Sequence, residues 1–169
     1  MSTQIANMDP YVYPGTNVLR NLRDIRDRDL LSRFEMDMTT RRLSELARNP
    51  TVGQLDSQHI RAIHRHIFHD VYAWAGEFRT LNISKPGQFP FAFSHQIPQC
   101  IDRLSAELKR ERYLERLLLS QFCSRAAHYM GEINAIHPFR EGERTHTAQI
   151  HPAACRSKWI RTQLVPCVA

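Results

Sequence analysis

The sequence predicts a mainly α-helical protein with one short β-hairpin. Long stretches carry apolar residues at spacings of three and four, the periodicity of helices that bury one face. One stretch, 79–93, instead alternates apolar and polar residues on both sides of a Pro-Gly pair, which is typical of a hairpin. A chain of 169 residues favours a single domain. No apolar run approaches the roughly 18 residues that a membrane span needs, so we expect no membrane association.

The first helix is expected at 27–47, where Leu31, Phe34 and Met38 share one face. Residues 1–26 precede it and contain the segment DPYVYPGTN, which is punctuated by Pro, Gly and Tyr. Such a segment is typical of an extended arm with a turn.

The second helix is expected at 57–74, after the breakers in ARNPTVGQ. Asp56 or Ser57 suits its N-cap. Its apolar positions recur at helical spacing: Ile60, Ile63, Ile67 and Val71.

The hairpin follows. Pro86 and Gly87 suit the central positions of a type II turn. The flanking alternation comes from Leu81, Ile83, Phe89, Phe91 and Phe93. Further helices are expected at 97–110 and 114–136, and the last of them stops at His137-Pro138 because the residue before a proline is disfavoured in the helical region.

Charge and cysteine content exclude some function classes. Lys plus Arg number 23 against 17 Asp plus Glu, but the basic residues are dispersed among acidic ones, as in RDIRDRD. This favours solvated helix faces, and we expect no direct contact with nucleic acid. The start of the chain shows no basic segment followed by an apolar one, so we expect a cytoplasmic protein. Its reduced thiols would be Cys100, Cys123, Cys155 and Cys167, which form no CxxC pair.

The segment after the last expected helix carries the chemistry. His137 stands at its start, a carboxylate follows at Glu141, and Gly142 and Arg144 come next. Histidine accepts protons near neutral pH. Glycine-rich turns and arginines hold phosphate oxygens, and a carboxylate suits Mg²⁺ bound to a polyphosphate. Together these groups suit phosphoryl or nucleotidyl transfer to a hydroxyl; a capped junction between two helices is the alternative.

The strings HPFREG and SRAAHYMGEINAI closely resemble the Fic family, whose signature is H-P-F-x-[DE]-G-N-G-R-x-x-R. DPYVYPGTNVLRN, IHRHIFHDVYAWAGEFRTLNI and PFAF also resemble the bacterial pattern, so the likeness extends from Asp9 to Gly142. The family fold is a mainly α-helical core with a β-hairpin flap over the active-site loop. The resemblance therefore implies a Fic core at 27–142 between the arm at 1–26 and a tail at 143–169.

The resemblance implies a protein adenylyltransferase of bacterial toxin-like type, which moves AMP from ATP to a Ser, Thr or Tyr hydroxyl of a target protein. His137 would be the catalytic base and Glu141 the ligand of Mg²⁺. Gly142 and Arg144 would bind the nucleotide phosphates. Because some bacterial members modify type II topoisomerases, we expect a target of that kind.

The other residues implied by the resemblance shape and cover the site. Pro138 and Phe139 would be structural, with Phe139 packing the loop. The flap would bind the target's main chain by strand addition, through Leu81, Ile83 and Phe91.

The chain departs from the family signature after Gly142. Glu143 replaces the Asn-Gly pair and the second arginine is absent. Back-translation of the residues from Gly142 to His151, with one G deleted, gives Gly-Asn-Gly-Arg-Thr-Gln-Arg and restores the motif. We infer that the tail at 143–169 is out of frame, expect it to be poorly ordered, and expect adenylyl transfer by this chain to be impaired.

The histidines and the altered motif also admit other interpretations. A metal site could be suspected from a histidine cluster, but only two of its members are three residues apart on one helix, so we interpret them as surface residues: His59, His64, His66 and His69. A catalytically inactive Fic fold that acts as a binding module is the alternative function. No Ser or Thr has a Glu four residues later, which is the spacing of the family's inhibitory helix, so a separate small antitoxin protein is the expected regulator.

Overall fold

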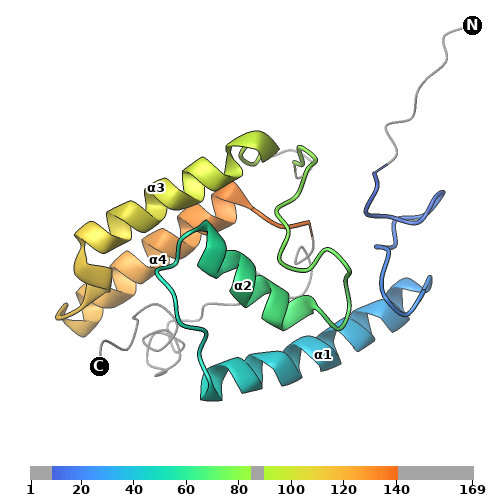
Figure 1. Ribbon diagram of the computed structural model, residues 1–169, viewed down its shortest axis with the longest axis horizontal. Helices are drawn as coiled ribbons and strands as arrows, with labels where there is room; N and C mark the ends of the chain where they lie inside the picture. The colour runs from blue at the N-terminus through green and yellow to red at the C-terminus, as the bar shows by residue number, and fades with distance from the viewer. Residues whose placement is uncertain (1–8, 85–89, 141–169) are drawn as a thin grey trace, which may run out of the picture.

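The computed structural model describes residues 9–84 and 90–140. These residues are mainly helical (Figure 1), which confirms the predicted mainly α class. The elements are α1 (Arg28–Arg48), α2 (Ser57–Phe68), α3 (Ile97–Arg110) and α4 (Leu119–Ile136), with the short 3₁₀ turns η1 (Ser94–Gln96) and η2 (Arg112–Leu114).

Two hydrophobic clusters hold the helices together, and α2 lies between α1 and the α3–α4 pair (Figure 1). The first cluster joins the N-terminal arm, α1 and α2 around side chains such as Leu31 and Phe68. The second fills the interface of α3 with α4, where Ile97 and Ile101 have no exposed surface. Phe34 and Met38, predicted on the apolar face of the first helix, pack against the first cluster while half-buried.

The second helix begins as predicted but ends early. Asp56 is its N-cap, and its carboxylate accepts from the His59 N–H at 2.9 Å. The prediction of helix over 57–74 is wrong beyond Phe68, where a turn brings the fully buried Val71 and Tyr72 into the first cluster.

The last helix begins later than predicted, at Leu119 and not at 114. The apolar pattern continues through the preceding residues, but the chain must reverse there so that α4 can pack against α3. The reversal uses positive φ values of 53–64° at Arg112, Tyr113, Leu114 and Arg116.

The predicted hairpin is not confirmed. In 79–84 and 90–93, the structure shows no strand, only an isolated antiparallel bridge between Ser84 and Pro90. A proline supplies no N–H for a ladder, which limits pairing at this point. Residues 85–89, with the predicted Pro-Gly turn, lie outside the described residues.

The arm is described from residue 9 onward. Val12 and Leu19 form an antiparallel bridge, and the buried Tyr13 and Val18 belong to the first cluster. The division into arm, core and tail stays a prediction, since the expected disorder at 143–169 concerns residues outside those described. None of the helices in the described ranges combines the length and apolar composition of a bilayer span.

An ion pair fixes the turn after α2 to α1. Arg42 donates to both carboxylate oxygens of Asp70, from Nε at 2.6 Å and from Nη2 at 3.0 Å, and also to Glu45 at 2.8 Å. These hydrogen bonds from Arg42 lower the pKa of the Asp70 carboxyl. The planar guanidinium fork suits this two-point contact.

Asp70→Asn should lower the free energy of unfolding at pH 7 by about 0.5–1 kcal/mol, because it removes the charge from a partly exposed ion pair while Arg42 stays paired with Glu45. Since folding lowers the pKa of Asp70, its contribution is present above the unfolded pKa of about 3.9 and is lost as pH falls through the folded value. Urea denaturation from pH 7 to pH 3 should therefore show the parent and the variant converging below about pH 4. The exposed Asp37→Ala on α1 is the control, and a constant difference at all pH values would contradict the prediction.

Candidate active site

The candidate site lies at the C-terminal end of α4, where His137 caps the helix. Its backbone is left-handed, with φ 48° and ψ 68°, and its N–H donates to the Ile133 carbonyl at 2.9 Å. Pro138 explains why the helix ends here. A left-handed conformation costs a residue with a Cβ about 1–2 kcal/mol, so the neighbouring contacts must hold it.

The imidazole of His137 is covered by an aromatic ring from the segment predicted as the flap. The Phe91 ring stacks on it with centroids 4.2 Å apart and planes 15° from parallel. His137 is partly buried, and its Nε2 atom is shielded from solvent. The predicted base therefore lies in a partly apolar environment.

Leu81 and Ile83 are half-buried, while Asn82 between them is exposed, in agreement with the alternation in the sequence. The Phe91 N–H donates to the Ile83 carbonyl at 3.3 Å, and the Asn82 side chain accepts from the Ser94 N–H at 2.9 Å. The two arms of this segment thus lie side by side.

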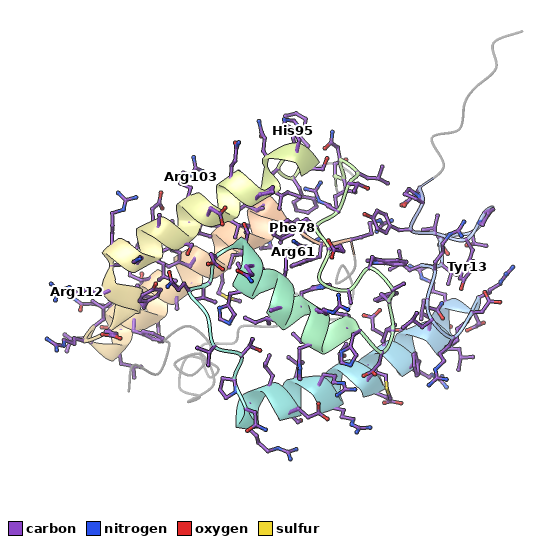
Figure 2. The ribbon with its side chains drawn as sticks, in the orientation of Figure 1. Tyr13, Arg61, Phe78, His95, Arg103 and Arg112 are labelled. Atoms are coloured by element: carbon purple, nitrogen blue, oxygen red, sulfur yellow. The ribbon has the colours of Figure 1, made fainter. Side chains whose placement is uncertain are left out.

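Phe139 packs into a row of rings. It stacks on His64 at 3.7 Å between centroids and lies 5.4 Å from Phe78, while His64 also stacks on Phe68 at 4.6 Å. Arg61 of α2 lies over the ring of Phe78 (Figure 2), with 5.7 Å between its guanidinium carbon and the ring centroid. The loop after His137 is in this way joined to α2.

His64 and His59 correct the interpretation of the four histidines as surface residues, since they are only 8% and 6% exposed. His59 contacts the Thr51 carbonyl at 2.8 Å and the Leu55 N–H at 3.0 Å. His64 accepts through Nδ1 from the Gly76 N–H at 2.9 Å, in a turn where Gly76 has φ 84°. Their rings are buried because they satisfy backbone groups of neighbouring loops.

The arm also reaches the site. Arg140 donates to the Asp9 carboxylate from Nη2 at 2.7 Å and from Nε at 3.2 Å. The Tyr11 hydroxyl accepts from the Thr80 N–H at 3.2 Å, and its ring meets Trp74 edge-on at 5.2 Å. The sequence carries no signal for the contact between Asp9 and Arg140, because 131 residues separate them.

Arg79 is a further residue that sequence analysis missed. It is 2% exposed, and its N–H donates to the Pro138 carbonyl at 2.9 Å. Burial lowers the pKa of its guanidinium. An arginine at the edge of a predicted hairpin carries no signal of burial, because arginines are mostly exposed.

Glu141, Gly142 and Arg144 lie outside the described residues. Within the described ranges, no group of three or more His, Cys, Asp or Glu side chains could hold a metal ion. The structure brings together the residues that were predicted as base, loop and flap, namely His137, Pro138, Phe139, Leu81, Ile83 and Phe91.

The profile of the Fic/DOC family matches residues 54–151. Over 135 residues, the chain is 44% identical to the probable protein adenylyltransferase y4lH of Sinorhizobium fredii, covering 79% of this chain and 68% of that protein. It is 42% identical over 134 residues to the protein adenylyltransferase VbhT of Bartonella schoenbuchensis, covering 79% of this chain. The chain spans only 28% of VbhT.

The fold is similar to that of BepC, a VirB-translocated effector protein of Bartonella tribocorum whose crystal structure holds AMPPNP. The TM-score is 0.73 at 25% identity, covering 78% of this chain and 70% of the BepC chain.

His64→Ala should lower the free energy of unfolding by about 2–4 kcal/mol, because it leaves the buried Gly76 N–H without its acceptor and removes the ring beneath Phe139. His64→Asn is the matched variant, since its amide oxygen can accept that N–H. Chemical denaturation should rank the parent above His64→Asn and His64→Asn above His64→Ala. Equal stability of the two variants would contradict a role for the Gly76 bond.

Proposed function

Because this chain belongs to the Fic/DOC family, we propose that its fold is that of a protein adenylyltransferase, which transfers AMP from ATP to a Ser, Thr or Tyr hydroxyl of a target protein. The observation that carries the proposal is the position of His137, at the end of α4 and beneath Phe91. The relatives named protein adenylyltransferases support the same class of reaction.

His137 takes the role of the general base. The hydroxyl oxygen of the target attacks the α-phosphorus, pyrophosphate leaves, and the hydroxyl proton passes to the imidazole. A neutral imidazole accepts this proton at physiological pH. Contacts around the fixed backbone of His137 limit its movement, and catalysis of this kind depends mainly on positioning.

The segment 79–93 takes the role of the flap that binds the target. The antiparallel Ser84–Pro90 bridge and the bond from Phe91 to Ile83 support a hairpin-like course of its two arms. An extended target segment could add to such an edge through its main chain, with Leu81, Ile83 and Phe91 contacting its side chains.

ATP binding is assigned to the residues that follow Arg140. Gly142 and Arg144 suit the phosphates, and Glu141 supplies the hard oxygen ligand that Mg²⁺ requires. Bound Mg²⁺ would neutralise part of the negative charge of the phosphates. The AMPPNP bound to BepC supports a nucleotide site in this fold.

The partners follow from the same proposal. A cytoplasmic protein with an accessible hydroxyl, such as a type II topoisomerase, is the proposed target, and a small antitoxin protein is the proposed regulator. Glu143, in place of the family's Asn-Gly pair, favours a second candidate function, a binding module that engages the target without transferring AMP.

The chain as it stands should transfer AMP at least about 10²–10³-fold more slowly than a chain with the restored motif, because loss of a single oxyanion donor already has this effect. In the restored chain, Glu141 is followed by Gly-Asn-Gly-Arg-Thr-Gln-Arg, the string that back-translation with one G deleted gives. The measurement is the rate at which each of the two chains incorporates labelled AMP into the proteins of a lysate or into a purified topoisomerase. Equal transfer rates of the two chains would refute the predicted impairment of this chain. Absence of labelling by the restored chain would refute the proposed adenylyltransferase activity.

In the restored chain, His137→Ala should reduce AMP transfer by about 10²–10⁴-fold while leaving ATP affinity nearly unchanged, because the imidazole acts on the target hydroxyl. Glu141→Ala should instead weaken Mg²⁺-dependent ATP binding measured by calorimetry. The exposed His128→Ala on α4 is the control. A His137→Ala variant that transfers AMP at the control rate would overturn the assignment of the base.

A further inference from the structure

The buried guanidinium of Arg79 joins the flap to the end of α4. From the flap segment, the Leu81 carbonyl accepts from Nη1 at 2.6 Å, and the Ala92 carbonyl accepts from Nη2 at 2.5 Å. From the end of α4, the His137 carbonyl accepts from Nε at 2.7 Å, and the Ile136 carbonyl accepts from Nη2 at 3.2 Å. One side chain thus contacts both arms of the flap segment and the backbone of the proposed base.

All four of these acceptors are backbone carbonyls, which is unusual for a cation with only 2% of its surface exposed. A buried charge is costly unless it is hydrogen-bonded. The carbonyls of Ile136 and His137 lie at the C-terminal end of α4, where the helix dipole favours a positive charge. Arginine fits because its planar group offers five N–H donors in a fixed fork.

The same contacts set the geometry of His137. Its carbonyl accepts from the Arg79 side chain, and the next carbonyl, that of Pro138, accepts from the Arg79 N–H at 2.9 Å. Both of these carbonyls follow the left-handed backbone of His137, on its C-terminal side. Phe91, which stacks on the imidazole, immediately precedes Ala92, an acceptor of the guanidinium.

We propose that Arg79 is a positioning residue of the active site: its guanidinium holds both arms of the flap segment at a fixed place relative to His137, with Phe91 over the imidazole. The target segment bound by the flap is thereby presented to the base in one register. This inference rests on the proposed function, but its structural part is tested without any catalysis.

The first test uses Arg79→Lys in the full chain, because lysine keeps the charge but loses the fork. Hydrogen exchange followed by mass spectrometry should be about tenfold faster in peptides covering 80–84, 90–93 and 134–140, and unchanged in α1 and α3. Arg125→Lys on α4, which alters the Arg125–Glu111 pair, is the matched control and should leave those peptides protected. Faster exchange throughout the chain, or no change at the flap, would overturn the proposal.

A spectroscopic measurement reports on the stack itself. The ring current of Phe91 shifts the His137 ring protons upfield, so Phe91→Leu should move them downfield, and Arg79→Lys should move them in the same direction. His137 signals that stay at the parent position in Arg79→Lys would overturn the proposal.

A third measurement needs no variant and stands if Arg79→Lys fails to fold. If one joint holds these segments, the amides of Arg79, Phe91 and His137 open together in the unmodified chain, with protection factors that agree within about threefold. Clearly different protection factors would overturn the proposal.

Kinetics then test the catalytic consequence in the restored chain. Arg79→Lys should lower kcat by about 10²-fold, the effect of a small misplacement of reacting groups, and leave the KM for ATP within about twofold. A raised KM for ATP with unchanged kcat would place Arg79 in nucleotide binding and refute the proposal. Absence of transfer in the restored parent would refute the proposed function, while the exchange and spectroscopic results would still decide the role of Arg79.

Discussion

The left-handed backbone of His137 is the constraint on which the rest of the site depends. Pro138 prevents α4 from continuing, and the chain must turn sharply while the histidine stays at the helix end. A residue with a side chain adopts this conformation only when neighbouring contacts outweigh its cost of about 1–2 kcal/mol. Those contacts come from segments far apart in the sequence: Arg79 bonds the carbonyls of His137 and Pro138, Phe91 stacks on the His137 ring, and Phe139 packs against His64 of α2.

The N-terminal arm extends this arrangement. Asp9 pairs with Arg140 at the far end of the loop, and Tyr11 bonds the Thr80 N–H directly after Arg79. The arm therefore contacts both the loop after α4, which carries His137, and the beginning of the segment 79–93. The arm was predicted as an extended segment with a turn, and it also supports the site. Asp9 and Tyr11 at its start bond the Arg140 side chain and the Thr80 N–H.

Helices α1 and α3 could be predicted to within one residue, because their apolar periodicity coincides with Asp27 and Pro50 on either side of α1 and with Pro98 in the first turn of α3. The prediction failed where the apolar periodicity continued past the end of the helix. Val71 prolongs the pattern of α2 and Leu114 that of α4, yet both residues lie in turns, from which their side chains are buried. Within the site, His137 and Phe139 could be found from the motif. Arg79 and Asp9 could not, since the acceptors of the Arg79 side chain are backbone carbonyls and the ion pair of Asp9 spans 131 residues.

The division of the site between two parts of the chain bears on what the altered motif can change. In the part of the chain that the structure describes, the Arg79 guanidinium bonds the His137 carbonyl, Phe91 stacks on the imidazole, and Phe139 stacks on His64. The positions that we propose to bind phosphate, Gly142 and Arg144, come later in the chain, and Glu143 between them brings a negative charge to the proposed place of the phosphate oxygens. A change confined to the residues after Gly142 therefore alters groups that we propose to orient ATP, and it alters none of the residues that make these described contacts. This is the basis for proposing a binding module as the second candidate function.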